Sequence, residues 1–164
     1  MFRLLHRVRG VYWRVAKPTT YGVKVLIVHA ADAERVLLVR HSYGDRSLWS
    51  LPGGGYRPAR ETPEQAARRE CVEELGVGLD PSALVLAEHL TANGGRQGHL
   101  KIVRVCASSD GVRPNGEISE ARWTTLDLAD LPDDPPVSKW VHSALKAHAQ
   151  DRHGGGMSRP ATTR

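Results

Sequence analysis

Cysteine is scarce in this 164-residue sequence, which contains only Cys71 and Cys106. Two isolated cysteines form neither a metal-binding or redox motif nor a disulfide framework, so we expect a reducing compartment. Long apolar runs are missing too, since none approaches the roughly 18 residues that suggest a membrane span. The N-terminus lacks the uninterrupted apolar core and the small-residue cleavage site of a secretory signal. We therefore predict a cytoplasmic protein with no membrane span.

Phenylalanine is almost absent, with one residue against four tryptophans and four tyrosines, so aliphatic side chains must fill most of the interior. The remaining composition is that of an ordinary globular protein, 40% hydrophobic and 25% charged, and its length suits one domain. The net charge of +5 favours encounters with anions such as nucleotides, nucleic acid or an acidic membrane surface. The charge alone does not choose among these partners.

The order of predicted elements indicates an α/β or α+β layered fold. Aliphatic and β-branched runs predict strands over 23–29, 36–40, 84–90 and 100–106, and a further strand around 121–126. A helix lies between the second and third strands, and a last helix with one apolar stripe is expected to begin at Pro136.

Three segments are predicted along the chain. Residues 1–17 have apolar positions at three- and four-residue intervals with arginines between them, which predicts a basic amphipathic helix. We interpret it as docked on the domain; binding to anionic lipid or to a partner, including a second copy in a homodimer, stays open. Residues 18–150 form the domain, and the Gly-, Ser- and Thr-rich residues 151–164 are predicted to be a disordered tail.

The mid-chain helix has the clearest local signals. Thr62 suits the N-cap, Pro63 the first helical position, and Gln65 completes a capping box, while Gly76 marks the far end. Apolar residues on one side of this helix are expected to pack against a sheet: Cys71, Val72 and Leu75.

Three glutamates, Glu70, Glu73 and Glu74, share the other face of this helix at about 100° per residue. Like charges at this spacing repel by a few tenths of a kcal/mol per pair, and the helix dipole disfavours acids so late in a helix. Positions 77 and 78 are Val and Gly, so no lysine compensates at i+4. Mg²⁺ prefers carboxylate oxygens, waters and substrate phosphates. The cluster therefore predicts a cation site rather than a solvated acidic face.

Residues 53–77 resemble the signature of the Nudix hydrolase superfamily. That signature is Gly, five residues, Glu, seven residues, Arg-Glu, an apolar residue, any residue, Glu-Glu, any residue, Gly and an apolar residue. The matching positions are Gly55, Glu61, Arg69, Glu70, Cys71, Glu73, Glu74, Gly76 and Val77. The Trp-Ser-Leu-Pro-Gly-Gly run at 49–54 also resembles the family's approach to this box.

The resemblance implies an α/β/α sandwich around a mixed β-sheet. It also implies hydrolysis of a phosphoanhydride bond in a nucleoside diphosphate linked to another group, with water as nucleophile and Mg²⁺ or Mn²⁺ as cofactor. Two subfamily marks are absent, because Asn93 and Gly95 stand where a proline and a tyrosine would be expected. The resemblance thus selects neither ADP-ribose nor a dinucleoside polyphosphate.

Two alternatives stay open. The basic charge favours an RNA 5′-end pyrophosphohydrolase, but no aromatic-interleaved basic motif supports binding of nucleic acid, which we do not expect as a partner. A nucleotide-sensing module without turnover would usually have an eroded box, and this box is intact.

Roles follow from the resemblance, residue by residue. Glu70 and Glu74 should be the main metal ligands, Glu73 a further or water-bridged ligand, and a backbone carbonyl of Gly54 or Gly55 an additional one. Two other box residues should have supporting roles: Arg69 should orient a box glutamate, and Glu61 should brace the loop against the helix.

The general base and the substrate contacts are less specified. A carboxylate must accept the proton of the attacking water, and the candidates are Glu73, Glu74, Glu117 and Glu120. The strand end and loop before the box offer further candidates, because arginine can hold phosphate and tyrosine can stack on a base. These candidate substrate-binding residues are Arg40, His41, Tyr43 and Arg46.

Overall fold

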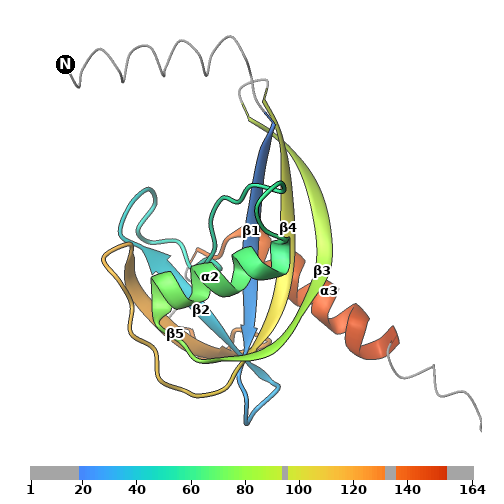
Figure 1. Cartoon of the computed structure of the whole chain (residues 1–164). Helices are drawn as coiled ribbons and strands as arrows, with labels where there is room; N and C mark the ends of the chain where they lie inside the picture. Colours follow the sequence, from blue (N-terminus) through green and yellow to red (C-terminus); the bar gives the residue numbers. More distant parts are fainter. Residues whose placement is uncertain (1–18, 94–95, 132–135, 155–164) are drawn as a thin grey trace, which may run out of the picture.

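The computed structural model describes residues 19–93, 96–131 and 136–154 (Figure 1). The predicted helix over 1–17 lies outside the described residues, as do residues 155–164 of the predicted tail. The elements are β1 (Thr20–Val28), β2 (Arg35–His41), α2 (Pro63–Leu75), β3 (Leu79–Asn93), β4 (Arg96–Ala107), β5 (Ile118–Thr125) and α3 (Lys139–Gly154). No helix among these is long and apolar enough to cross a lipid bilayer.

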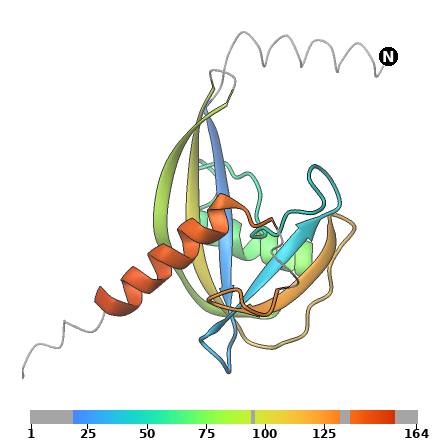
Figure 2. The same cartoon turned by 180° about the vertical axis from the view of Figure 1, so that it is seen from behind.

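The five strands form one mixed sheet in the order β3-β4-β1-β2-β5. β1 runs parallel to β4, and the other neighbouring pairs are antiparallel. The two helices cover opposite faces of this sheet, as the views from front and back show (Figures 1 and 2). The predicted α/β/α sandwich around a mixed sheet is therefore confirmed.

Each face of the sheet has its own hydrophobic core, because alternate residues of a strand point to opposite faces. On β1, Val23, Val25 and Ile27 pack in the core that contains Ala66, Cys71 and Leu75 of α2. Leu26 and Val28 pack in the core that contains Trp49 and Val141 and Ala144 of α3. The sheet is thus buried on both sides in its centre, which fixes the position of both helices.

β1 and β2 pair directly at only two positions, Ile27 with Leu37 and Val28 with Val36, and then diverge. The segment 50–56 fills the gap between them. On the β2 side, Val39 and Ser50 exchange two hydrogen bonds of 2.9 and 2.8 Å. On the β1 side, three hydrogen bonds of 2.9 to 3.0 Å join the segment to the strand: Val25 N to Pro52 O, Val23 N to Gly54 O and Tyr56 N to Tyr21 O. The glycines before α2 are therefore held inside the sheet.

Several predicted boundaries need correction. β3 begins at Leu79 and β4 at Arg96, so both are longer than the predicted 84–90 and 100–106. The prediction depended on an aliphatic run, which Asp80, Pro81 and Ser82 interrupt, and β3 also has two register irregularities. The last helix begins at Lys139 rather than Pro136, because Trp49 N donates to Pro136 O and Ser138 N donates to Trp49 O.

Each of the two helices gives one further correction. α3 continues through Gly154, so residues 151–154 are helical and do not belong to a disordered tail. On α2, Cys71 and Leu75 are buried as predicted, but the side chain of Val72 is 58% exposed. Val72 lies about 100° around the helix from Cys71, which places it at the solvent edge of the buried face.

Candidate functional site

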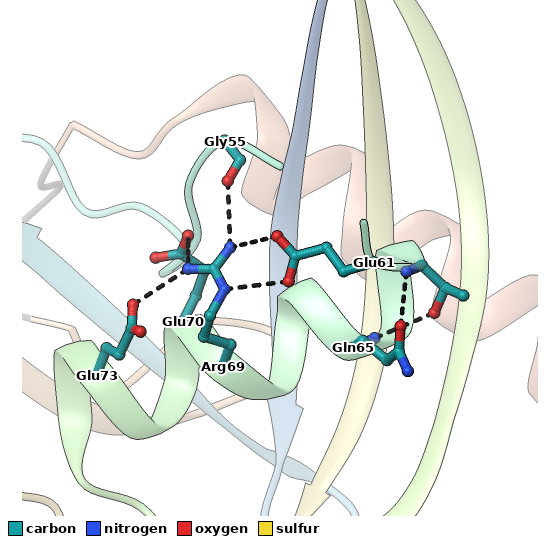
Figure 3. A network of polar contacts seen from close by, with 7 residues as sticks. Gly55, Glu61, Gln65, Arg69, Glu70 and Glu73 are labelled. Carbon is teal, nitrogen blue, oxygen red and sulfur yellow. Dashed lines mark hydrogen bonds and ion pairs between the residues drawn. The ribbon is translucent and has the colours of Figure 1, made fainter. Parts of the chain in front are cut away.

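The N-terminus of α2 is fixed by the capping box that the sequence predicts (Figure 3). Thr62 N donates to the Gln65 side chain at 2.9 Å, and Gln65 N donates to Thr62 Oγ1 at 3.3 Å. At the other end Gly76 adopts the left-handed conformation, with φ 56°, and donates to Val72 O. These caps set the start and end of the helix, and so the direction in which each glutamate points.

Arg69 joins the loop before the helix to the acids on it (Figure 3). Its guanidinium donates to both carboxylate oxygens of Glu61, at 2.9 and 3.1 Å, and to Gly55 O at 3.2 Å. The same group donates to Glu70 at 2.8 Å and to Glu73 at 3.1 Å. The hydrogen bonds with Glu61 and then Glu70 raise the pKa of Arg69. Arg69 thus links the loop before the helix to two box glutamates, and the bracing role of Glu61 and the orienting role of Arg69 stay predictions.

The three box glutamates occupy different environments. Glu73 is exposed, Glu70 is mostly buried, and Glu74 is only 3% exposed. Gly53 N donates to Glu74 Oε2 at 3.0 Å. Burial raises the pKa of Glu74 to about 7; the neighbouring Glu70 adds to this rise, and the Gly53 hydrogen bond and Lys24 oppose it. Glu74 is thus a buried acid whose negative charge the protein only partly compensates.

Two glycines of segment 53–55, Gly53 and Gly54, closely approach β1 and the acids. Gly53 has φ 134°, and a Cβ at this position would collide with the carbonyl group of Val23. A Cβ on Gly54 would collide with the carboxylate of Glu70. Gly54 O accepts from Val23 N, and each carbonyl oxygen has a second lone pair for another partner.

The donor chemistry of this arrangement fits a hard divalent cation. Among the described residues, no three acidic, His or Cys side chains already form a metal-binding group, and Arg69 holds Glu70 and Glu73. Mg²⁺ commonly uses only one or two carboxylates and takes its other ligands from waters and substrate phosphates. Glu70 and Glu74, with a carbonyl of Gly54 or Gly55, supply such a set.

The two distal acids lie in different surroundings. Glu120 pairs with Arg40 at 3.2 Å and with Arg122 at 3.6 Å. Glu117 is exposed, and its charge is close enough to contribute to the raised pKa of Glu74. Its loop is fastened to the end of α2, because Asn115 N donates to Glu74 O at 2.8 Å. The structure therefore brings Glu117 to the box and leaves Glu120 in a separate ion-pair cluster.

The four predicted substrate-binding residues also have different surroundings. Arg40 is engaged by Glu120 and lies 4.6 Å above the Trp49 ring, and Arg46 lies exposed on its loop. Tyr43 is 56% exposed, with its ring 5.1 Å from the His41 ring. Burial, and then the negative charges of Glu74 and Glu117, raise the pKa of Tyr43.

Two residues of this site were not identified from the sequence. Lys24 lies in the apolar run of β1, and its Nζ donates to Leu51 O at 3.0 Å. Burial lowers the pKa of Lys24, and Glu74 and Glu70 oppose that shift. A lone lysine inside an apolar strand pattern was the available signal. Asn115, in an Asn-Gly turn, also donates from its side chain to Glu73 O at 2.9 Å.

Two cavities border the glycine segment. One, of about 600 Å³, is lined by Lys24, Gly53–Gly55, the facing parts of β3 and β4, and Lys139 and Trp140 at the start of α3. The other, of about 720 Å³, lies between the start of β1 and residues 55–61. The same glycines contact the acids, so the first cavity borders the predicted cation site, although none of the described acids lines the cavity itself.

Comparison with known proteins identifies related sequences and structures. The family model described as NUDIX domain matches residues 20–144. A Mycobacterium tuberculosis protein named "Putative 8-oxo-dGTP diphosphatase 3" is 32% identical over 128 residues, which cover 70% of this chain and 57% of that protein. The chain thus spans little more than half the length of this relative.

Nudix hydrolases are also found among the similar solved structures. The crystal structure of a MutT NUDIX hydrolase from Burkholderia pseudomallei is 27% identical, with TM-score 0.63, and covers 79% of this chain and 98% of that one. The Nudix hydrolase RenU from M. smegmatis is 26% identical, with TM-score 0.54, covering 90% and 91% of the two chains.

Proposed function

Because this chain belongs to the Nudix family, we propose that it is a metal-dependent pyrophosphohydrolase. Its substrate would be a nucleoside diphosphate linked to another group, and water would cleave the phosphoanhydride bond. The observation that carries this proposal is the position of Glu74, a buried carboxylate beside Glu70, held by the same glycine that lines the 600 Å³ cavity. A buried charge needs a compensating partner, and a cation shared with a phosphate would provide one.

Glu70 and Glu74 would hold Mg²⁺ or Mn²⁺, with a carbonyl of Gly54 or Gly55, and Glu73 through water. A cation bound there would supply charge neutralisation of the phosphate oxygens and a lowered pKa of a bound water. Arg69 keeps Glu70 in place through its contacts with Glu61, since partners behind metal ligands fix their orientation.

The chain's own residues would orient the substrate and move the proton. Glu117 is the best-placed acceptor for the proton of the attacking water, because it is exposed beside Glu74 while Glu120 is paired with arginines. Tyr43 offers an exposed ring on which a base can stack. The names of the relatives make a nucleoside triphosphate with an oxidised base, such as 8-oxo-dGTP, the first substrate to test.

A substrate screen tests this function. It would include 8-oxo-dGTP, ordinary nucleoside di- and triphosphates, nucleotide sugars, dinucleoside polyphosphates and RNA with a 5′-triphosphate, each with Mg²⁺ and Mn²⁺. Mass identification of both products locates the cleaved bond. We expect cleavage between two phosphorus atoms that excess EDTA abolishes. Turnover that persists in EDTA would remove the metal from the proposal, and no cleavage of any compound would reject the activity.

Arg69→Gln should weaken Mn²⁺ binding by about 10- to 100-fold, the usual effect of removing a partner behind a metal ligand. The variant leaves Glu61, Glu70 and Glu73 without their shared cation. Isothermal titration with Mn²⁺ measures the change, and Arg60→Gln, at an exposed arginine next to Glu61, is the control. An unchanged Mn²⁺ affinity in Arg69→Gln would show that Arg69 does not support the metal ligands.

A further inference from the structure

Lys24 is held in β1 directly opposite the glycine segment. The residues on either side of it, Val23 and Val25, donate their backbone N–H groups to Gly54 O and Pro52 O, both at 2.9 Å. The backbone of Lys24 is therefore fixed with respect to the loop that contacts Glu70 and Glu74. Its side chain leaves the strand on the same face as Gly22, toward the cavity of about 600 Å³ that both residues line.

The ammonium group of Lys24 has more donors than the described residues use. Within these residues it has one acceptor in hydrogen-bond range, Leu51 O at 3.0 Å, whereas an ammonium group has three N–H donors. The other basic side chains around the site are engaged differently: Arg69 binds three carboxylates, and Arg40 is paired with Glu120. Lys24 thus has donors to spare beside the glycine segment; Lys139, the other lysine that lines this cavity, lies at the start of α3 with its Nζ over the Trp140 ring.

The cavity brings this ammonium group together with the proposed site of chemistry. Gly53, Gly54 and Gly55 line the cavity with Lys24, and the same three residues contact Glu74, Glu70 and Arg69 respectively. A diphosphate lying along the glycine segment would therefore be within reach of both the acids and Lys24. A compact ammonium on a flexible stem is suited to binding a phosphate oxygen.

We propose that Lys24 binds a phosphate oxygen of the substrate and so positions the diphosphate along the glycine segment. The inference rests on the proposed function for the identity of the substrate, but it concerns a residue outside the family's box. The simpler alternative is that Lys24 only balances the buried charge of Glu74. The two roles differ in what happens when Glu74 is also neutral.

A double-mutant cycle separates these roles. The variants are Lys24→Met, Glu74→Gln and the double variant, and the probe is inorganic pyrophosphate, titrated calorimetrically in EDTA so that no divalent cation contributes. Lys146→Met, which removes the same charge from the exposed side of α3, is the control. Thermal melting of every variant reports its folding, and the double variant guards against the buried unpaired charge that Lys24→Met alone leaves behind.

If Lys24 binds phosphate, Lys24→Met should weaken pyrophosphate binding by about 10- to 100-fold in the Glu74→Gln background, the range for a hydrogen bond to a charged group. Lys146→Met should leave the affinity unchanged. Equal pyrophosphate affinities of Glu74→Gln and the double variant would overturn the inference and assign Lys24 to charge balance. Absence of binding to Glu74→Gln at millimolar pyrophosphate would overturn it as well.

The outcome is independent of the substrate screen, because binding in EDTA requires no turnover. If no compound in the screen is cleaved but Lys24 still controls pyrophosphate binding, the proposed hydrolysis fails and the phosphate contact stands. If cleavage occurs and Lys24→Met changes only the melting temperature, the hydrolysis stands and the phosphate contact fails. Lys24→Arg retains the positive charge, so it should recover part of the pyrophosphate affinity that Lys24→Met loses.

Discussion

Glu74→Gln should lower kcat by about 10²- to 10⁴-fold, a loss as large as that of a general base, because the cation that would activate the attacking water loses a ligand. The substitution keeps the shape of the side chain and removes the charge that would hold the cation beside Glu70. Phosphate or nucleotide release under saturating Mg²⁺, with the best substrate from the screen, measures the change. The matched control is Glu64→Gln in the first turn of the same helix, which should keep wild-type turnover.

The melting temperature distinguishes a chemical loss from misfolding. The carboxyl group of Glu74 has a pKa of about 7 in the fold, against 4.5 without it, so the fold favours its protonated form. Without metal, ionised Glu74 therefore destabilises the fold increasingly as pH rises from 4.5 through 7. In EDTA, Glu74→Gln should melt at or above the wild-type temperature, and the gap should widen over that pH interval. Near-normal turnover in this variant would refute its role.

Gly53→Ala should cost about 2 to 4 kcal/mol of unfolding free energy, combining backbone strain with a steric collision. Its φ of 134° is one that residues with a side chain rarely adopt, and the added Cβ would collide with the backbone of Val23. The same change would displace the N–H that binds Glu74, so turnover should fall with stability. Urea unfolding monitored by tryptophan fluorescence measures the loss.

Gly111→Ala is the control for this substitution, since a Cβ there meets no atom within 4 Å. We expect a change below about 0.5 kcal/mol, as for other surface substitutions. Equal urea midpoints for Gly53→Ala and Gly111→Ala would mean that segment 50–56 can shift to accept a side chain, and that its close packing against β1 is dispensable.

The central helix could be predicted in detail because its signals are local. Thr62, Gln65 and Gly76 set its ends, and the spacing of the acids along it identifies the family signature. The environment of each acid is a tertiary property, however. The sequence places Glu73 and Glu74 on one face, whereas burial separates them, because Gly53 reaches Glu74 from another part of the chain.

Other features depend on contacts between distant segments, which periodicity does not report. α3 starts at Lys139 rather than at the predicted Pro136, because Trp49, some 90 residues earlier in the chain, pairs with the residues just before the helix. Arg40 shares one face of β2 with Leu38 and pairs in register with Glu120 of β5, so its two partners, Glu120 and Trp49, come from other segments of the chain. The catalytic and binding roles assigned to the site residues stay predictions until the variants are measured.

The hydrogen bonds that tie segment 50–56 to both β1 and β2 also bear on how proteins with this fold can diversify. Residues 42–49 form a loop after the end of β2 at His41. The chain returns to the sheet at Ser50, which exchanges backbone hydrogen bonds with Val39. A change in the length of this loop would leave the position of segment 50–56 in the sheet unchanged. We expect evolution to alter substrate preference here while the acids and glycines keep their places.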